Sequence, residues 1–315
     1  MKYNFIDLFA GIGGMRIGFE NACKELGYDC KCVFSSEWDD KCQDTYEINF
    51  GERPEGDITK IIENNFDSIP NHDILMAGFP CQPFSNAGLR KGFKDTRGTL
   101  FHSIATVLDK KRPKAFILEN VKGLRSHDGG KTLEVILKVL REDLNYYVPD
   151  PKVLNSKDFG LPQNRQRIFI VGFLKKNMFT FPEPLNIPTK VSNILNSGRP
   201  PKKYIISQKL WASHKARKQK NKEAGKGFGY SLKDPSDEYT NTISARYYKD
   251  GAEILIKRKG KAIPRKLAPD EARQLQGFPN DFKINKSDIQ AYKQFGNAVS
   301  VPVVQELSKK LLEYL

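Results

Sequence analysis

Long apolar runs are missing from this sequence. No stretch approaches the roughly 20 consecutive apolar residues that a transmembrane helix needs, and the amino terminus, residues 1–7, lacks the apolar core of a signal peptide. The 39% hydrophobic content over 315 residues is instead ordinary for a globular chain with room for one large and one small domain. We therefore expect a cytoplasmic protein that does not insert into a membrane.

Cysteine is also scarce, with five residues in the whole chain. A small, odd number of cysteines in a long chain favours a reducing compartment over a disulfide framework. Cys30 and Cys32 have no second cysteine pair and no histidine at ligand spacing, so no metal site is expected. Internal repeats and low-complexity tracts are absent as well.

Acidic residues are few in one part of the chain. The formal net charge is +15, and the segment from Leu185 to Asp270 contributes +13 of it, with 20 Lys and Arg against 7 Asp and Glu. Charge concentrated in one segment indicates a polyanionic partner such as nucleic acid. A membrane surface is the alternative, but the segment has no long amphipathic helix with a wide apolar face.

Prolines indicate where the basic segment begins. Five of them lie between Phe181 and Pro201 and interrupt the periodic pattern of the sequence. We predict a larger domain of residues 1–182 and 280–315 and a smaller, basic domain of residues 183–279.

The first 60 residues have the pattern of a nucleotide-binding unit. Residues 5–10 read as a strand, residues 11–14 as a glycine turn and residues 15–26 as a helix. A second strand, residues 32–35, leads to Glu37, about 20 residues beyond the glycines, where an acidic side chain accepts hydrogen bonds from ribose hydroxyls. Asp57 follows at the next turn, where it could equally cap a helix.

A second polar group follows the strand of residues 74–77. Pro80, Cys81 and Gln82 lie on the loop at its carboxyl end, where open α/β sheets place their chemistry. Prolines on both sides hold the Cys81 thiol on a stiff turn, although most free cysteines are simply buried. The glycine-rich, basic residues 88–98 that follow suit a lid over a charged ligand.

Two further polar groups are expected at the same edge of the sheet. Residues 115–118 read as a strand that ends in Glu119, which faces the same crevice unless it merely caps a helix. Gln163, Arg165 and Arg167 alternate along an extended stretch, so we expect their side chains on one face. Forked donors on one face suit phosphate or the carbonyl-bearing edge of a base.

The basic segment also contains a candidate for reading bases. Residues 242–256 predict two short strands with a turn at residues 249–251. Arg246 stands beside Tyr247 and Tyr248, which combines a bidentate donor with stacking surfaces.

Five motifs, taken together and in order, resemble those of the bacterial DNA (cytosine-5) methyltransferases. They are Phe-Ala-Gly-Ile-Gly-Gly (9–14), Gly-Phe-Pro-Cys-Gln-Pro-Phe-Ser (78–85), Glu-Asn-Val (119–121), Gln-Asn-Arg-Gln-Arg (163–167) and Gln-Phe-Gly-Asn-Ala-Val (294–299). The first two-thirds of the chain look like the HhaI-type members. The basic segment is closer to that of members that recognise CCGG or CCWGG sites.

The resemblance implies an α/β fold of the S-adenosylmethionine-dependent methyltransferases, a Rossmann-like sheet with a smaller DNA-recognition domain. It implies methylation of carbon 5 of a cytosine flipped out of double-stranded DNA. Cys81 would add to carbon 6 and so make carbon 5 nucleophilic, Glu119 would stabilise nitrogen 3, and Arg165 would contact the base carbonyl. Gln82 and Arg167 complete the expected catalytic set.

The resemblance also assigns binding residues. Those expected to hold S-adenosylmethionine are Phe9, Gly11, Ile12, Gly13, Gly14, Glu37, Trp38, Asp57, Ile58, Pro80, Leu100, Asn297 and Ala298. Those expected to contact DNA are Ser85, Arg90, Arg97, Arg246, Tyr247 and Tyr248. We further expect a monomer that is the modification half of a restriction-modification system.

Two alternatives remain at this point. A related branch of the fold methylates transfer RNA, although its members have a shorter domain in place of the basic segment. A binding protein without catalysis is the other, against which the presence of Cys81, Glu119 and Arg165 counts.

Overall fold

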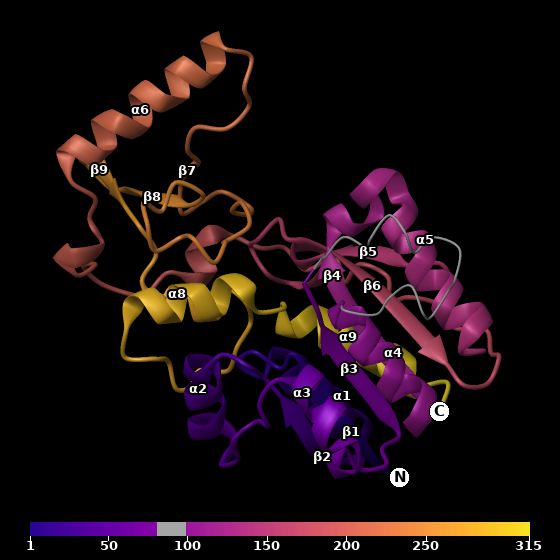
Figure 1. Ribbon diagram of the computed structural model, residues 1–315. Coiled ribbons are helices and arrows are strands. Elements are labelled where there is room, and N and C mark those ends of the chain that lie inside the picture. Colours follow the sequence, from indigo (N-terminus) through magenta and orange to yellow (C-terminus); the bar gives the residue numbers. More distant parts are fainter. Residues whose placement is uncertain (81–98) are drawn as a thin grey trace. The chain divides into compact units, whose positions relative to one another are not determined.

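The computed structural model describes residues 1–80 and 99–315, which form two compact units (Figure 1). The large unit comprises Met1–Leu154, Gln166–Glu183 and Val303–Leu315, and the small unit comprises Asn155–Arg165 and Pro184–Pro302. The functional division at residues 183 and 279 stays a prediction, because compactness does not say what each unit binds. In the described ranges no helix has both the length and the apolar character needed to cross a membrane.

A six-stranded sheet in the order β2-β1-β3-β4-β6-β5 forms the centre of the large unit. Neighbouring strands among β2, β1, β3 and β4 are parallel, and β6 runs antiparallel to β4. The strands predicted at residues 5–10, 32–35, 74–77 and 115–118 are present. The six strands of the sheet are β1 Lys2–Leu8, β2 Asp29–Ser36, β3 Ile74–Gly78, β4 Ala115–Val121, β5 Lys152–Asn155 and β6 Gln166–Phe173. The order changes direction at β1, so the crevice between the ends of β1 and β3 is the expected ligand position.

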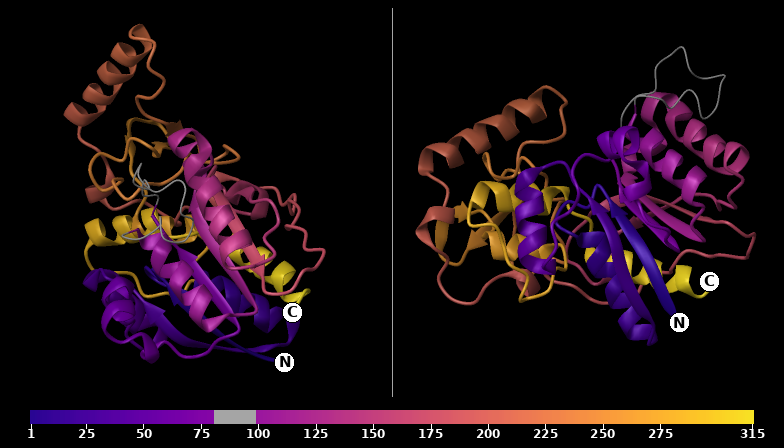
Figure 2. Two further views of the ribbon diagram at one scale, coloured as in Figure 1. Left: turned by 45° about the vertical axis from the view of Figure 1, so that its right-hand side comes forward. Right: turned by 60° about the horizontal axis from the view of Figure 1, so that its bottom comes forward.

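Helices cover both faces of this sheet (Figures 1 and 2). Apolar residues of α4 and α5, such as Ile104 and Ile136, pack with Leu8 and Leu75 on one face. On the other face α1 lies over β1 through the Phe5–Phe19 ring pair, whose centroids are 4.8 Å apart. The helices of this unit are α1 Gly14–Leu26, α2 Asp40–Phe50, α3 Ile58–Asn64, α4 Leu100–Lys111, α5 Lys131–Lys138 and α9 Val301–Leu312.

The small unit contains a three-stranded sheet, β7-β8-β9, and three helices (Figure 1). The strands are β7 Leu232–Lys233, β8 Leu255–Arg258 and β9 Lys261–Arg265, and the helices are α6 Gln208–Glu223, α7 Pro269–Leu275 and α8 Asp288–Asn297. Helix α6 is basic and mostly exposed, and of its residues only His214 is buried.

The expected pair of strands within residues 242–256 was wrong. Residues 245–250 form consecutive turns, and only the last two residues of the stretch belong to a strand, β8. The Tyr247 hydroxyl donates to the Ile254 carbonyl and accepts from the Leu267 amide, 2.6 and 2.8 Å away. These bonds fold the stretch back on itself, so it cannot extend into a strand.

Candidate active site

The glycine turn lies at the end of β1 and depends on left-handed backbone. Gly11 and Gly13 have φ of 56° and 83°, a region in which residues with a Cβ are disfavoured. A Cβ on Gly13 would also lie 2.3 Å from the Phe50 ring, so no larger residue fits there. The turn is thus a close-fitting backbone loop that leads directly into α1.

Glu37 connects this turn to the end of β2. Its two carboxylate oxygens accept from the Gly11 amide at 2.8 Å and from the Asp39 amide at 2.9 Å. Burial raises the pKa of Glu37, while these amide donors oppose the shift. Since each carboxylate oxygen can accept two hydrogen bonds, Glu37 can hold the turn and still accept from a ligand.

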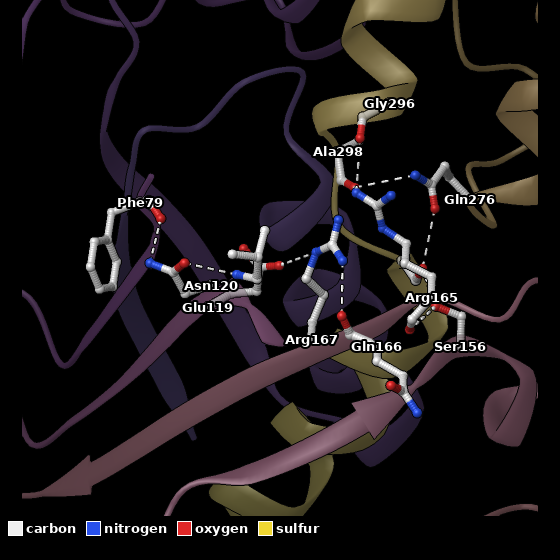
Figure 3. A network of polar contacts seen from close by, with 12 residues as sticks. Phe79, Glu119, Asn120, Ser156, Arg165, Gln166, Arg167, Gln276, Gly296 and Ala298 are labelled. Atoms are coloured by element: carbon white, nitrogen blue, oxygen red, sulfur yellow. Dashed lines mark hydrogen bonds and ion pairs between the residues drawn. The ribbon is translucent and has the colours of Figure 1, made fainter. Parts of the chain in front are cut away.

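Glu119 stands at the end of β4, directly beside the end of β3. It is in register with Gly78, where a Cβ would lie in ordinary van der Waals contact with Glu119 Oε2, 3.4 Å away. Asn120 Nδ2 donates to the Phe79 carbonyl at 2.8 Å (Figure 3). The two strand ends are therefore tied together two residues before Cys81.

Arg167, on β6, forms an ion pair with the Glu119 carboxylate. Its Nε lies 3.1 Å from Glu119 Oε1 (Figure 3), and only 17% of its side chain and 11% of that of Glu119 are exposed. Burial lowers the pKa of Arg167, and Glu119 opposes that shift. Such a largely buried, charge-assisted pair keeps both groups fixed at the sheet edge.

Arg165 has a different environment, within the small unit. Its guanidinium donates to the carbonyls of Gly296 and Ala298 at 3.0 and 2.7 Å (Figure 3). It also donates to the Ile243 carbonyl at 3.0 Å, and the residue is 1% exposed. Gln163 likewise bonds to the Leu275 carbonyl and Gln276. The expectation that Gln163, Arg165 and Arg167 share one face was wrong, because the Arg165 amide turns back to the Gln163 carbonyl at 3.0 Å and breaks the extended alternation.

The sequence model of the family described as "C-5 cytosine-specific DNA methylase" matches residues 3–313. The chain belongs to this family. It is 55% identical to the Type II methyltransferase M1.ScrFI of Lactococcus lactis subsp. cremoris over 100% of this chain and 79% of that protein. It is 48% identical to M.HpaII of Haemophilus parainfluenzae over 100% of this chain and 90% of that protein.

The solved structures agree with this membership at the level of the fold. The S. pombe Dnmt2 methyltransferase matches with a TM-score of 0.79 and 19% identity, over 100% of this chain and 99% of that one. The methylase therefore has the expected α/β fold, methylates carbon 5 of cytosine in DNA and takes its methyl group from S-adenosylmethionine.

The residues of the large unit fit this cofactor. Its sulfonium is cationic, and the acidic Glu37 and Asp57 lie at neighbouring turns of the methylase. Asp57 caps α3 through Oδ1, which accepts from the Thr59 amide and hydroxyl, and Oδ2 bonds to none of the described residues. Trp38, next to Glu37, is 73% exposed, which is unusual for a large aromatic side chain and suits stacking on an adenine.

The remaining predicted residues fall into three groups. Within the large unit Phe9 has a φ of 57°, Ile12 and Ile58 are buried, Pro80 is exposed and Leu100 begins α4. Asn297 ends α8 in the small unit, and Ala298 follows it. The described part of the chain does not include Cys81, Gln82, Ser85, Arg90 or Arg97.

Of the three described DNA-contact candidates, one was wrong. Arg246 is exposed and Tyr248 is partly exposed, so both can reach a ligand. Tyr247 is 0% exposed, and its ring packs against Tyr292 with centroids 5.2 Å apart. It is a core residue that supports the turn carrying its neighbours.

Two residues of the site were not predicted from the sequence. Asn120 adjoins Glu119 within one of the five motifs, and its bond to Phe79 depends on strand register that the motif does not reveal. Asp7, on β1 four residues before Gly11, is buried, and neither carboxylate oxygen has a hydrogen-bond partner among the described residues. An Asp inside an apolar strand was the available signal.

Proposed function

We propose that the methylase modifies one cytosine within a short sequence of double-stranded DNA and that Cys81 is its nucleophile. The observation that supports this most directly is the Glu119–Arg167 pair beside Gly78, three residues before Cys81. The glycine turn stands at the end of the adjacent strand, β1. A nucleophile, an acid–base group and a methyl-donor site would thus share one edge of the sheet.

The residues then have distinct roles in the reaction. The Cys81 thiolate adds to carbon 6 of the ring, which moves electron density to carbon 5 and onto nitrogen 3. Glu119, in its protonated form, donates a hydrogen bond to nitrogen 3 and so stabilises that charge. Bound S-adenosylmethionine supplies the methyl group that carbon 5 takes up. A base then removes the carbon 5 proton, and the Cys81 thiolate leaves to restore the aromatic ring.

Arg167, in place of Arg165, is our candidate for the base carbonyl. Arg167 already contacts Glu119, so a donor next to nitrogen 3 would lie where the carbonyl of the same ring is expected. The Nη1 and Nη2 atoms of Arg165 are engaged by three backbone carbonyls. Removing it would therefore disturb the small unit first.

The target cytosine must leave the helix to be reached, because carbon 6 is stacked within a duplex. We propose that Ser85, Arg90 and Arg97 close behind the flipped base. Arg246 and Tyr248 would read the flanking bases, and the exposed lysines of α6 would neutralise phosphates.

The wider setting follows from the relatives. M1.ScrFI and M.HpaII are Type II methyltransferases, so we propose that this methylase is the modification half of a restriction-modification system and works in the cytoplasm. We further propose that it acts as a monomer and needs no metal.

The test compares two substrates. Purified methylase with labelled S-adenosylmethionine should label duplex DNA and leave transfer RNA unlabelled, and bisulfite sequencing should find one methylated sequence. Labelling of transfer RNA alone would refute the proposal. Duplex DNA containing 5-fluorocytosine should form a covalent complex with the wild type and none with a Cys81→Ser variant, because the fluorine cannot leave as a proton does.

A further inference from the structure

The short loop Pro162–Arg165 holds the segment Thr240–Ile243, which leads into Arg246. We propose that this loop is a latch that fixes the position of the turn of residues 245–250, which carries Arg246 and Tyr248. Gln163 and Arg165 are then positioning residues for sequence specificity. The inference rests on the proposed reading of DNA by Arg246 and Tyr248. All the contacts that support it lie within the small unit.

Backbone groups make the first part of the latch. The Thr240 amide donates to the Pro162 carbonyl at 2.8 Å, and the Asn164 amide donates to the Thr240 carbonyl at 2.9 Å. Two residues on, the Thr242 hydroxyl donates to the Asn164 carbonyl at 2.7 Å. Bonds that alternate between two segments in this way specify their register, because a shift by one residue would break all of them.

Two side chains then hold Ile243 from both sides of the residue. Gln163 Oε1 accepts from the Ile243 amide at 3.0 Å, and Arg165 Nη1 donates to the Ile243 carbonyl at 3.0 Å. Gln163 is 0% and Arg165 is 1% exposed, so water cannot replace these bonds if they are broken. Buried polar groups without partners are costly, which gives the latch one strongly preferred arrangement.

The other end of the Arg165 guanidinium grips the end of α8. It donates to the carbonyls of Gly296 and Ala298. At Gly296 the backbone that follows Ile243 comes so close that a Cβ would lie 2.3 Å from the Ala245 amide nitrogen. The backbone just before Arg246 is thus bonded to Arg165 at Ile243 and packs closely on Gly296 at Ser244 and Ala245.

This arrangement decides how Arg246 meets a base. Bidentate recognition of a base edge requires donors and acceptors to align within the short range of a hydrogen bond. If the segment before Arg246 were loose, the side chain would accept several base pairs with similar affinity. The latch therefore affects the preference for one DNA sequence over another more than the methylation rate at any single sequence.

The test uses variants that remove single bonds of the latch. Thr242→Val removes the hydrogen bond from the hydroxyl to the Asn164 carbonyl with little change of shape. Arg165→Lys keeps the positive charge but removes the planar guanidinium that bonds to three carbonyls. The matched control is Thr106→Val, which removes a hydroxyl–carbonyl bond of 2.8 Å within α4 of the large unit. Each variant methylates a randomised duplex library, and bisulfite sequencing ranks the methylated sequences.

We expect the preference of Thr242→Val for the wild-type sequence over single-base variants to fall about fivefold to tenfold. The preference of Arg165→Lys should fall further, and that of Thr106→Val should not change. If Thr242→Val keeps the wild-type sequence preference, the latch is refuted, and this holds even if Arg165→Lys does not fold. A purely structural role would lower the methylation rate at all sequences alike and leave the preference unchanged. Failure of the wild type to methylate any duplex would instead refute the proposed function.

Discussion

Asp7 gives the sharpest prediction about the energetics of the fold. It lies on β1 between residues of the apolar core, is 1% exposed and has no hydrogen-bond partner for either oxygen among the described residues. Burial raises its pKa from 3.8 to about 7; Arg16 opposes this shift, and Glu37 adds to it. Glu20, Cys32 and Tyr46 are the other titratable groups near it.

The sign of the pH effect follows from this raised pKa. Between pH 3.8 and about 7 the unfolded chain has released the Asp7 proton while the folded protein still holds it. Rising pH therefore favours the unfolded state across that window, and the effect is complete above the folded pKa. Between pH 5 and the folded pKa of about 7, roughly two pH units, only the folded state holds the proton. Going from pH 5 to pH 8 should therefore lower the free energy of unfolding by about 3 kcal/mol through this group.

Asp7→Asn removes this titration. The free energy of unfolding is measured without cofactor by urea titration at pH 5 and at pH 8. Its decrease from pH 5 to pH 8 should be about 3 kcal/mol smaller in the variant than in the wild type. Any cost of burying the amide is independent of pH and cancels in that difference. Asp29→Asn, at an exposed position of β2, is the control and should behave like the wild type. Equal pH dependence in the wild type and Asp7→Asn would refute a buried, neutral Asp7.

Three further predictions concern the proposed functions. Arg167→Ala should lower the single-turnover methylation rate about 100-fold, the scale for removing one donor in the transition state, without changing S-adenosylmethionine affinity; an unchanged rate would remove Arg167 from the mechanism. Trp38→Ala should weaken S-adenosylmethionine binding about tenfold in calorimetry, the scale of one base–aromatic stack, whereas Ile48→Ala, at another exposed apolar residue, should not. Replacing the exposed lysines of α6 at positions 215, 218 and 222 by Gln should reduce the salt slope of DNA affinity by about 0.9 for each phosphate that is no longer neutralised; an unchanged slope would place the DNA elsewhere.

Local patterns were sufficient for much of the large unit. Apolar runs predicted the strand that ends just before Glu37 and the strand that carries Glu119. The glycine turn requires left-handed backbone that few other residues adopt. The Asp57 cap was also predictable, since a carboxylate before a helix accepts from its first amides. Period and backbone preference are properties of neighbouring residues, so they can be read along the chain.

The sequence by itself determined the α/β order of elements, the five motifs, the cofactor class and the location of the positive charge. Only the tertiary structure decided which arginine meets Glu119, because Arg165 and Arg167 are the same residue type two positions apart and the turn between them directs them to different partners. It also decided that Tyr247 is core and that Asp7 is buried without a hydrogen bond to the described residues. Such outcomes depend on contacts between residues distant in sequence, and neither period nor motif specifies those contacts.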